Sequence, residues 1–145
     1  MSGSEALVRA AASVNGAAAA SLVEAAIGAA LDGGFEASVA VVDNAGVLRS
    51  FARTDGAPFL TVDIAIGKAW TAVSLGYPSH VWNQLSADPA FAPLARLPRV
   101  VAVGGGYPLR SGGMVVGAIG VSGGTTQQDQ DAAIAAMRGV GFDVG

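Results

Sequence analysis

The sequence predicts an α+β domain in which helices cover both faces of a central antiparallel sheet, a three-layer α/β/α arrangement. Segments with helical periodicity are interspersed with short β-branched segments, and one pair of strands is joined by a turn too short for a parallel crossover. The 145 residues, 52% of them hydrophobic, suffice for one core and not for two. We therefore expect a single domain over residues 15–145, preceded by a helical extension over residues 1–14.

The first half of the chain is expected to contain two helices and a hairpin. Asn15-Gly16 reads as a stop between the helices, and the second helix carries only Glu24 as a charge, so it is apolar nearly all round and suited to a buried position. The turn Asn44-Ala45-Gly46 separates two strands. In chain order, the expected elements are helices over residues 4–14 and 17–31 and strands over residues 38–43 and 47–53.

The second half is expected to contain three helices and two further strands. Ser79 is a candidate N-cap for the middle helix, and Thr125 with Gln128 forms a capping box before the last one. Three prolines make residues 86–98 an irregular connection. The expected elements are helices over residues 61–75, 80–85 and 127–137, and strands over residues 100–103 and 114–121, with a glycine-rich loop and a turn over residues 104–113.

Composition narrows the function classes. Only 13% of the residues are charged, against about 25% in a typical soluble domain, so we expect a homo-oligomer whose interface uses the surplus apolar surface. The net charge of −3, with basic residues scattered singly, argues against nucleic acid, and no basic amphipathic stretch or signal segment points to a membrane. The expected location is the cytoplasm. With no Cys and one His, no metal cluster is predicted.

Two glycine clusters at strand ends are the main candidates for a site. Residues 120–124 match G-x-S-x-G, but a serine hydrolase needs an acid and a His after the serine, and the one His lies upstream. We therefore interpret Ser122 and Gly123 as sources of backbone N–H groups that meet an anion or a carbonyl. Gly105 and Gly106 form a second such cluster, for which a tight turn is the alternative.

These clusters suggest a site for a small carboxylated molecule. Arg53 or Lys68 would hold the carboxylate, although Lys68 has the alternative of pairing with Asp43, Asp55 or Asp63. The amides of Gly105, Gly106, Ser122 and Gly123 would stabilise an oxyanion. Asp55, His80 or Tyr107 would serve as acid or base, and His80 has the alternative of a plain first-turn helix residue. Hydrolysis, deamination and tautomerisation would each suit this set.

The chain resembles the GlcG/HbpS family, a domain also found at the C-terminus of PduO-type proteins and associated with haem binding or degradation. The resemblance implies a profilin-like α/β/α domain assembled into a homo-oligomer, with haem or corrinoid-linked binding in some members and small-molecule enzymes in others. It is carried by residues 41–46 (VVDNAG), 53–58 (RTDGAP), 64–73 (IAIGKAWTAV), 105–109 (GGYPL), 116–124 (VGAIGVSGG) and 128–131 (QDQD).

A haem cofactor stays open at this point. Proteins hold haem iron through His, Cys, Met or Tyr. The chain has no Cys, and its first long helix, where some haem-binding relatives place a His, has none. Tyr77, His80 and Tyr107 are the remaining candidate ligands. The sequence thus leaves two hypotheses: an oligomer that binds, and acts on, a small organic anion, and a non-catalytic module that binds haem or another tetrapyrrole. Either site is expected where two subunits meet.

Overall fold

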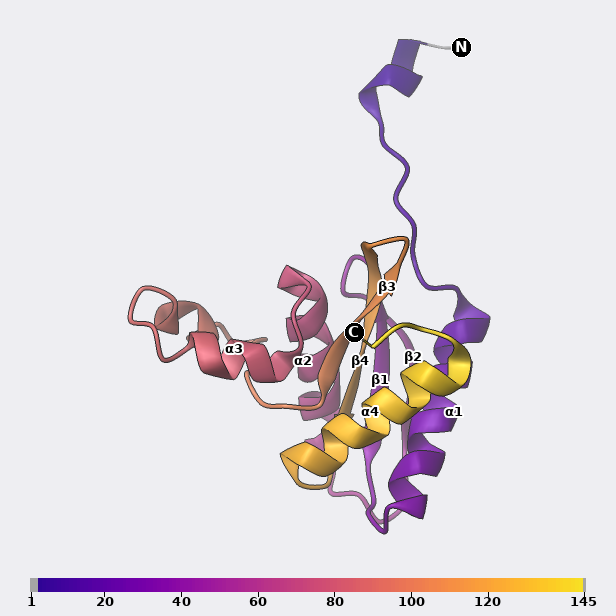
Figure 1. The fold of residues 1–145 in the computed structure, drawn as a ribbon, viewed down its shortest axis with the longest axis vertical. Helices are drawn as coiled ribbons and strands as arrows, with labels where there is room; N and C mark the ends of the chain where they lie inside the picture. The colour runs from indigo at the N-terminus through magenta and orange to yellow at the C-terminus, as the bar shows by residue number, and fades with distance from the viewer. Residues whose placement is uncertain (1–2, 145) are drawn as a thin grey trace.

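The computed structural model describes residues 3–144, and its elements form the predicted three-layer α+β domain (Figure 1). Four strands form one sheet in the order β2-β1-β4-β3, and every neighbouring pair is antiparallel. The elements are η1 (Gly3–Leu7), α1 (Gly16–Asp32), β1 (Ser38–Asp43), β2 (Leu48–Arg53), α2 (Leu60–Leu75), α3 (Ser79–Leu85), η2 (Ala92–Arg96), β3 (Gly106–Ser111), β4 (Met114–Ser122) and α4 (Thr126–Val140).

Residue size alternates along the strands and sets how closely each helix layer approaches the sheet. The larger side chains of β1 and β4, such as Val39, Ile119 and Val121, pack in the core cluster beneath α1 and α4. Ala118 and Gly120 of β4 face the other way, toward α2. A Cβ on Gly120 would lie 2.1 Å from the carbonyl oxygen of Ala65, so α2 rests almost directly on the strand backbone.

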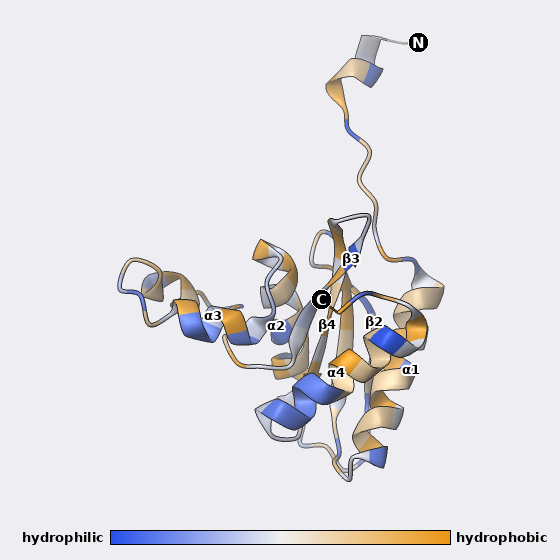
Figure 2. Ribbon diagram, viewed as in Figure 1, coloured by the Kyte–Doolittle hydropathy of each residue, from blue (hydrophilic) through white to orange (hydrophobic). Residues whose placement is uncertain are grey.

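The two helix layers differ in composition as well as in distance from the sheet. Helices α1 and α4 contact each other and cover one face, whereas α2 covers the opposite face and contacts α3 (Figure 1). Figure 2 shows α1 as apolar along most of its length and α4 as hydrophilic at its N-terminal end. The capping box of Thr125 and Gln128, which the sequence predicts, is present at that end.

The N-terminal segment departs from its prediction. Instead of a helix over residues 4–14, the structure has the short 3-10 helix η1, followed by an extended arm that leaves the body of the domain (Figure 1). Asn15 is a helix start and not a stop, because its side chain accepts a hydrogen bond from Ala18 N at 2.8 Å. Residues 4–13 are exposed, and an Ala-rich segment of this length that buries no apolar face is too short to hold a helix by itself.

The third strand also lies in a different place from the one predicted. Residues 100–103 are irregular, and β3 begins at Gly106. The glycines and Pro108 in this segment disfavour a strand by their intrinsic preferences. However, β3 is an edge strand, a position in a sheet that tolerates proline. The other elements match their predicted positions to within a few residues. Over residues 3–144, no helix combines the length and the hydropathy that crossing a bilayer would require.

Candidate functional site

The sheet register gathers the predicted site residues at one end of the sheet. Ser38 at the start of β1 pairs with Arg53 at the end of β2 and with Ser122 at the end of β4. On the other side of β4, Gly106 pairs with Gly120, so the glycine cluster that precedes β3 lies at the same end. The two glycine clusters therefore converge, as the sequence predicts, and Gly105 O accepts a hydrogen bond from Val121 N at 3.0 Å.

A buried ion pair lies where the clusters meet. Lys68 Nζ is 2.9 Å from Asp129 Oδ2 and donates a second hydrogen bond to Val121 O, also at 2.9 Å. The two side chains are 2% and 3% exposed. This contact corrects the predicted pairing of Lys68 with Asp43, Asp55 or Asp63. Gly105, with a φ of +125°, is required here, since a Cβ would lie 2.9 Å from Lys68 Nζ.

Burial dominates the electrostatics of this pair. Desolvation lowers the pKa of Lys68, while the hydrogen bond and the charge of Asp129 act in the opposite direction. Desolvation likewise raises the pKa of Asp129, while Lys68 and the backbone N–H groups of Gly124 and Gly123 act to lower it. The low-dielectric surroundings thus penalise both charges, and the pair is held by the polar groups that converge on it.

Most of the backbone donors in the two clusters already have internal partners. Gly124 N donates to Asp129 Oδ1 at 2.9 Å, so the anion that the Ser122–Gly124 turn meets is the chain's own carboxylate. Gly106 N donates to Ser79 Oγ at 2.8 Å, and Ser79 Oγ donates to Val103 O at 2.6 Å. Ser79 therefore pins the Gly104–Gly106 loop instead of capping its own helix, where Pro78 occupies the N-cap.

Arg53 and Asp55 remain apart from this buried cluster. Both side chains are exposed where β2 ends, and the nearby Gly56 N–H donates to Glu36 Oε2 at 3.3 Å. Their predicted roles in holding or protonating a substrate stay predictions. The structure thus brings Lys68, Gly105 and the Ser122–Gly123 turn together, and leaves Arg53 and Asp55 at the surface.

A second group of predicted residues converges at the β3 edge of the sheet. Tyr77, from the α2–α3 connection, and Tyr107, from β3, line one hollow of about 250 Å³ together with Arg110 and Met137. The His80 ring lies 5.8 Å from the Tyr107 ring and lines another hollow, of about 340 Å³. The contact between these two rings therefore links the linings of the two hollows.

Burial and hydrogen bonding differ among these three side chains. Desolvation raises the pKa of Tyr107, and the negative charge of Asp131 adds to the shift, so the phenol resists ionisation. His80 Nδ1 is buried and has no hydrogen-bond partner among residues 3–144. A buried N–H without a partner costs more than a buried lone pair, which favours the tautomer that carries its proton on Nε2. Tyr77 is 48% exposed.

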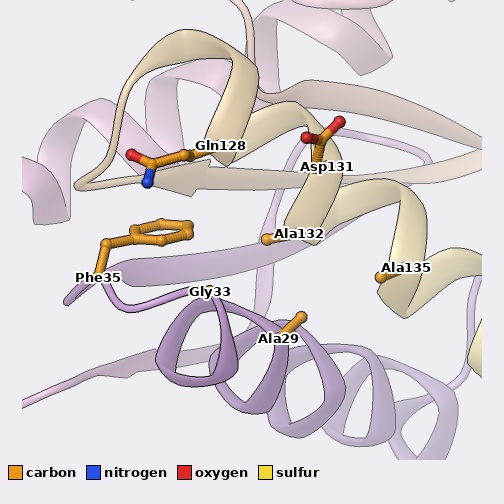
Figure 3. Close-up of a pocket in the computed structure, with 7 residues that line it drawn as sticks. All are labelled: Ala29, Gly33, Phe35, Gln128, Asp131, Ala132 and Ala135. Atoms are coloured by element: carbon orange, nitrogen blue, oxygen red, sulfur yellow. The ribbon is translucent and has the colours of Figure 1, made fainter.

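A further hollow, of about 400 Å³, lies between α1 and α4. It is lined by alanines of both helices, with Phe35 and Gln128 at one end and Asp131 on the rim (Figure 3). Asp131 is the one titratable side chain in its lining, and none of the predicted site residues lies there. This groove is apolar packing surface and not a reactive centre.

Sequence reasoning missed three residues that matter here. Ser79 was predicted only as a helix cap, and Asp129 was not predicted to pair with Lys68, whereas both make buried polar contacts. A signal for Asp129 was available, because Lys68 lies among Ala65, Ala69 and Ala72 on the buried face of α2 and must meet an acid. Nothing in the local pattern singled out Arg110.

The sequence and the fold of this chain are similar to those of several known proteins. The chain is 34% identical over 107 residues to the corrinoid adenosyltransferase PduO of Citrobacter freundii, covering 70% of this chain but 31% of that protein. The crystal structure of a PduOC:heme complex matches with a TM-score of 0.82 and 27% identity, over 90% of this chain and 97% of the other. A double mutant of Streptomyces reticuli HbpS matches with a TM-score of 0.85 and 32% identity, over 93% and 92%. Residues 14–138 match the family model for the haem degrading protein HbpS-like family, and the chain therefore belongs to that family.

Proposed function

We propose that this protein binds a carboxylated tetrapyrrole such as haem at the β3 edge of its sheet, without turning it over. The HbpS-like family and the similarity to a PduOC:heme complex support this class of ligand. When bound, haem would supply an iron that takes an oxygen or nitrogen ligand from the protein, and an intense visible absorption band. The site is the pair of hollows bordered by Tyr77, His80, Tyr107 and Arg110.

One observation carries the proposal. The chain has three side chains singled out as candidate iron ligands, and the fold collects all three on one face from separate segments. Tyr77 and Tyr107 line the same hollow, and the His80 ring lies 5.8 Å from that of Tyr107. His80 Nδ1, buried without a partner, is the kind of polar atom that a bound group or a repositioned ring would satisfy.

The chemistry of the three side chains favours Tyr77 as the residue that would hold the haem iron. A tyrosine ligates iron as a phenolate, which the raised pKa of Tyr107 disfavours. A histidine ligates through a nitrogen lone pair, which the tautomer inferred for His80 does not offer at Nε2. Tyr77 is half exposed and lines the hollow, so its oxygen is accessible. His80 would instead donate its Nε2 proton to an acceptor on the ligand.

Arg110 is placed to meet a carboxylate. Its Nη2 donates to Gly76 O at 2.6 Å and its Nη1 to Gly113 O at 3.4 Å, which orients the guanidinium along the rim of the hollow. A guanidinium has five N–H donors, so others remain for a ligand. Asp143 lines the same hollow and would disfavour a second carboxylate beside it.

The size of the hollows supports the expectation that two copies share the site. The two hollows have volumes of about 250 and 340 Å³, below and near the lower end of the range of about 300–1,000 Å³ in which ligand pockets usually fall. One copy would therefore cover only part of a tetrapyrrole, and a second copy would cover the rest.

Binding, and not oxyanion catalysis, is the activity this geometry favours. Of the donors predicted to stabilise an oxyanion, the N–H of Gly106 is bound to Ser79, while the amides of Gly123 and Gly124 interact with Asp129. Lys68, predicted to hold a carboxylate, is buried in its ion pair. An enzyme working through these groups would first have to break internal contacts.

Titration of the full-length protein with haem, followed by visible absorption, tests the proposal. We expect a saturable shift of the Soret band, with the charge-transfer band of a phenolate ligand. Tyr77→Phe should remove that band, whereas Tyr107→Phe, a matched loss of one hydroxyl, should retain it. Absence of a saturable Soret shift in the wild-type protein would overturn the proposal; a phenolate band lost in Tyr107→Phe and kept in Tyr77→Phe would overturn the ligand assignment.

A further inference from the structure

We infer that a fourth hollow, between α2 and residues 98–101, binds a small zwitterion with an aliphatic body, of the kind represented by a branched-chain α-amino acid. The hollow has a volume of about 330 Å³. Its lining comprises Asp63, Ile64, Ile66, Gly67, Pro98, Arg99 and Val101. None of these residues belongs to the β3-edge site, so the inference does not rest on the proposed function.

The first argument is that the hollow contains two opposite charges that do not neutralise each other. Arg99 and Asp63 both line it, yet within residues 3–144 the one ion pair is Lys68–Asp129. The Asp63 carboxylate makes no hydrogen bond with any of these residues. Two accessible charges of opposite sign around one hollow match a ligand that carries both an ammonium and a carboxylate.

The second argument is that the cation is held in place before any ligand arrives. The guanidinium carbon of Arg99 lies 4.4 Å from the centroid of the Trp70 ring, a cation–π contact that restrains the position of the guanidinium. Trp70 is itself backed by the β1–β2 turn, since a Cβ on Gly46 would lie 2.9 Å from the ring. Asp63 and Trp70 are seven residues apart in α2 and so share a helix face.

The third argument is that the two segments that line the hollow, α2 and residues 98–101, are held rigidly together. Val101 N donates to the buried Thr71 Oγ1 at 2.8 Å, which ties residues 98–101 to α2. Gly67 lets the two segments meet, because a Cβ there would lie 2.5 Å from Val101 Cγ2. The uncharged part of the lining thus consists of Val101 and Gly67, together with Ile64, Ile66 and Pro98.

These features together define the ligand class. The apolar walls favour an aliphatic body, Arg99 favours a carboxylate that it can engage with two parallel N–H donors, and Asp63 favours an ammonium. A dicarboxylate would be repelled by Asp63, and a simple amine would leave Arg99 without a partner. A neutral apolar molecule would leave both charges partly desolvated without compensation.

Leucine and two half-analogues test the inference on the full-length protein. We would follow the backbone amide signals of Gly67 and Val101 by NMR during titrations with leucine, with 4-methylpentanoate, which lacks the ammonium, and with 3-methylbutylamine, which lacks the carboxylate. We expect leucine to shift both signals saturably and to bind about tenfold more tightly than either half-analogue, in keeping with one lost charge-assisted contact in each.

Substitutions test the roles of Arg99 and Asp63 separately. Arg99→Gln should weaken leucine binding about tenfold and remove the advantage of leucine over the amine, whereas Asp63→Asn should remove its advantage over the carboxylate. Arg96→Gln and Glu24→Gln, matched exposed changes outside the hollow, should leave the leucine titration unchanged. Unmoved Gly67 and Val101 signals, or a half-analogue that binds as tightly as leucine, would overturn the inference.

Discussion

At the residue scale, the buried ion pair of Lys68 and Asp129 combines a desolvation cost with compensating hydrogen bonds. Each charge has lost its water, and each is compensated by hydrogen bonds from the partner and from the backbone at Val121 and Gly124. Such a pair adds little net stability over an apolar equivalent, but removing one partner leaves the other as an uncompensated buried charge.

We therefore predict unequal effects of single and double substitution. Lys68→Met should lower the free energy of unfolding by about 3–5 kcal/mol, because the buried carboxyl of Asp129 loses its charge partner. The double variant Lys68→Met with Asp129→Asn should recover much of that loss, since the asparagine oxygen can still accept from Gly124 N and no charge is buried. Urea unfolding of the wild-type protein and the variants measures both values; additive losses would contradict the prediction.

Tyr107 gives a pH-dependent prediction at the same scale. Its pKa is raised above the ordinary value of 10.0 by burial and by Asp131. In the Tyr77→Phe variant, where Tyr107 is the one remaining tyrosine, the ultraviolet titration should have its midpoint above pH 10.0, and Asp131→Asn in the same background should lower it. A midpoint at or below 10.0 would show that the phenol is solvated.

The raised pKa also fixes the sign of the effect on stability. The folded protein holds the Tyr107 proton more tightly than the unfolded chain does. The contribution of this proton to the free energy of unfolding is therefore complete below the pKa of the unfolded chain, near pH 10, and is lost as the pH rises through the pKa of the folded protein. Tyr107→Phe in the Tyr77→Phe background should reduce the alkaline loss of stability.

At the scale of elements, α2 and β4 illustrate packing that depends on missing side chains. We predict that Gly120→Ala lowers the free energy of unfolding by about 1–3 kcal/mol or more, because the new methyl would meet the backbone of Ala65, which cannot move aside cheaply. Gly28→Ala, in α1 with nothing within 4 Å of the added Cβ, should instead raise it by up to about 1 kcal/mol. Thermal unfolding measures the change in stability for both variants. Equal changes for Gly120→Ala and Gly28→Ala would mean that α2 can shift away from the sheet.

The elements also show which parts of the fold were predictable. Helix α2 and the β1–β2 hairpin follow from local periodicity and turn residues, and α4 from its capping box. The β3 strand was not predictable in this way, because its glycines and Pro108 are poor strand residues that an edge position tolerates. The helix expected in the N-terminal arm failed because helical propensity without packing is insufficient at that length.

The candidate site was predictable only in part, for a reason that belongs to the whole molecule. Convergence of the glycine clusters follows from strand ends meeting at one edge of the sheet, which a sequence can suggest. The partner of Lys68 lies 61 residues away, and the grouping of Tyr77, His80 and Tyr107 depends on how α3 docks. Such long-range contacts are set by the packing of the assembled domain.

The whole molecule also leaves large apolar side chains in contact with water, and these support self-association. Phe59 and Leu60, at the start of α2, are 83% and 67% exposed. We predict that Phe59→Glu shifts the protein toward monomer in light-scattering measurements and weakens haem binding with it, whereas Ser21→Glu, a new charge at an exposed polar position of α1 outside both hollows, does neither. A monomeric variant that binds haem fully would contradict a site shared between copies.

Pro108, described above as a residue of the outer strand β3, restricts how copies of the protein can join. A strand added alongside β3 would need a continuous ladder of backbone donors, and proline breaks that ladder by supplying none. Growth of the sheet across this boundary, the route by which many β-rich proteins form fibrils, is thereby discouraged. A copy that associated at this edge would therefore have to use side-chain contacts.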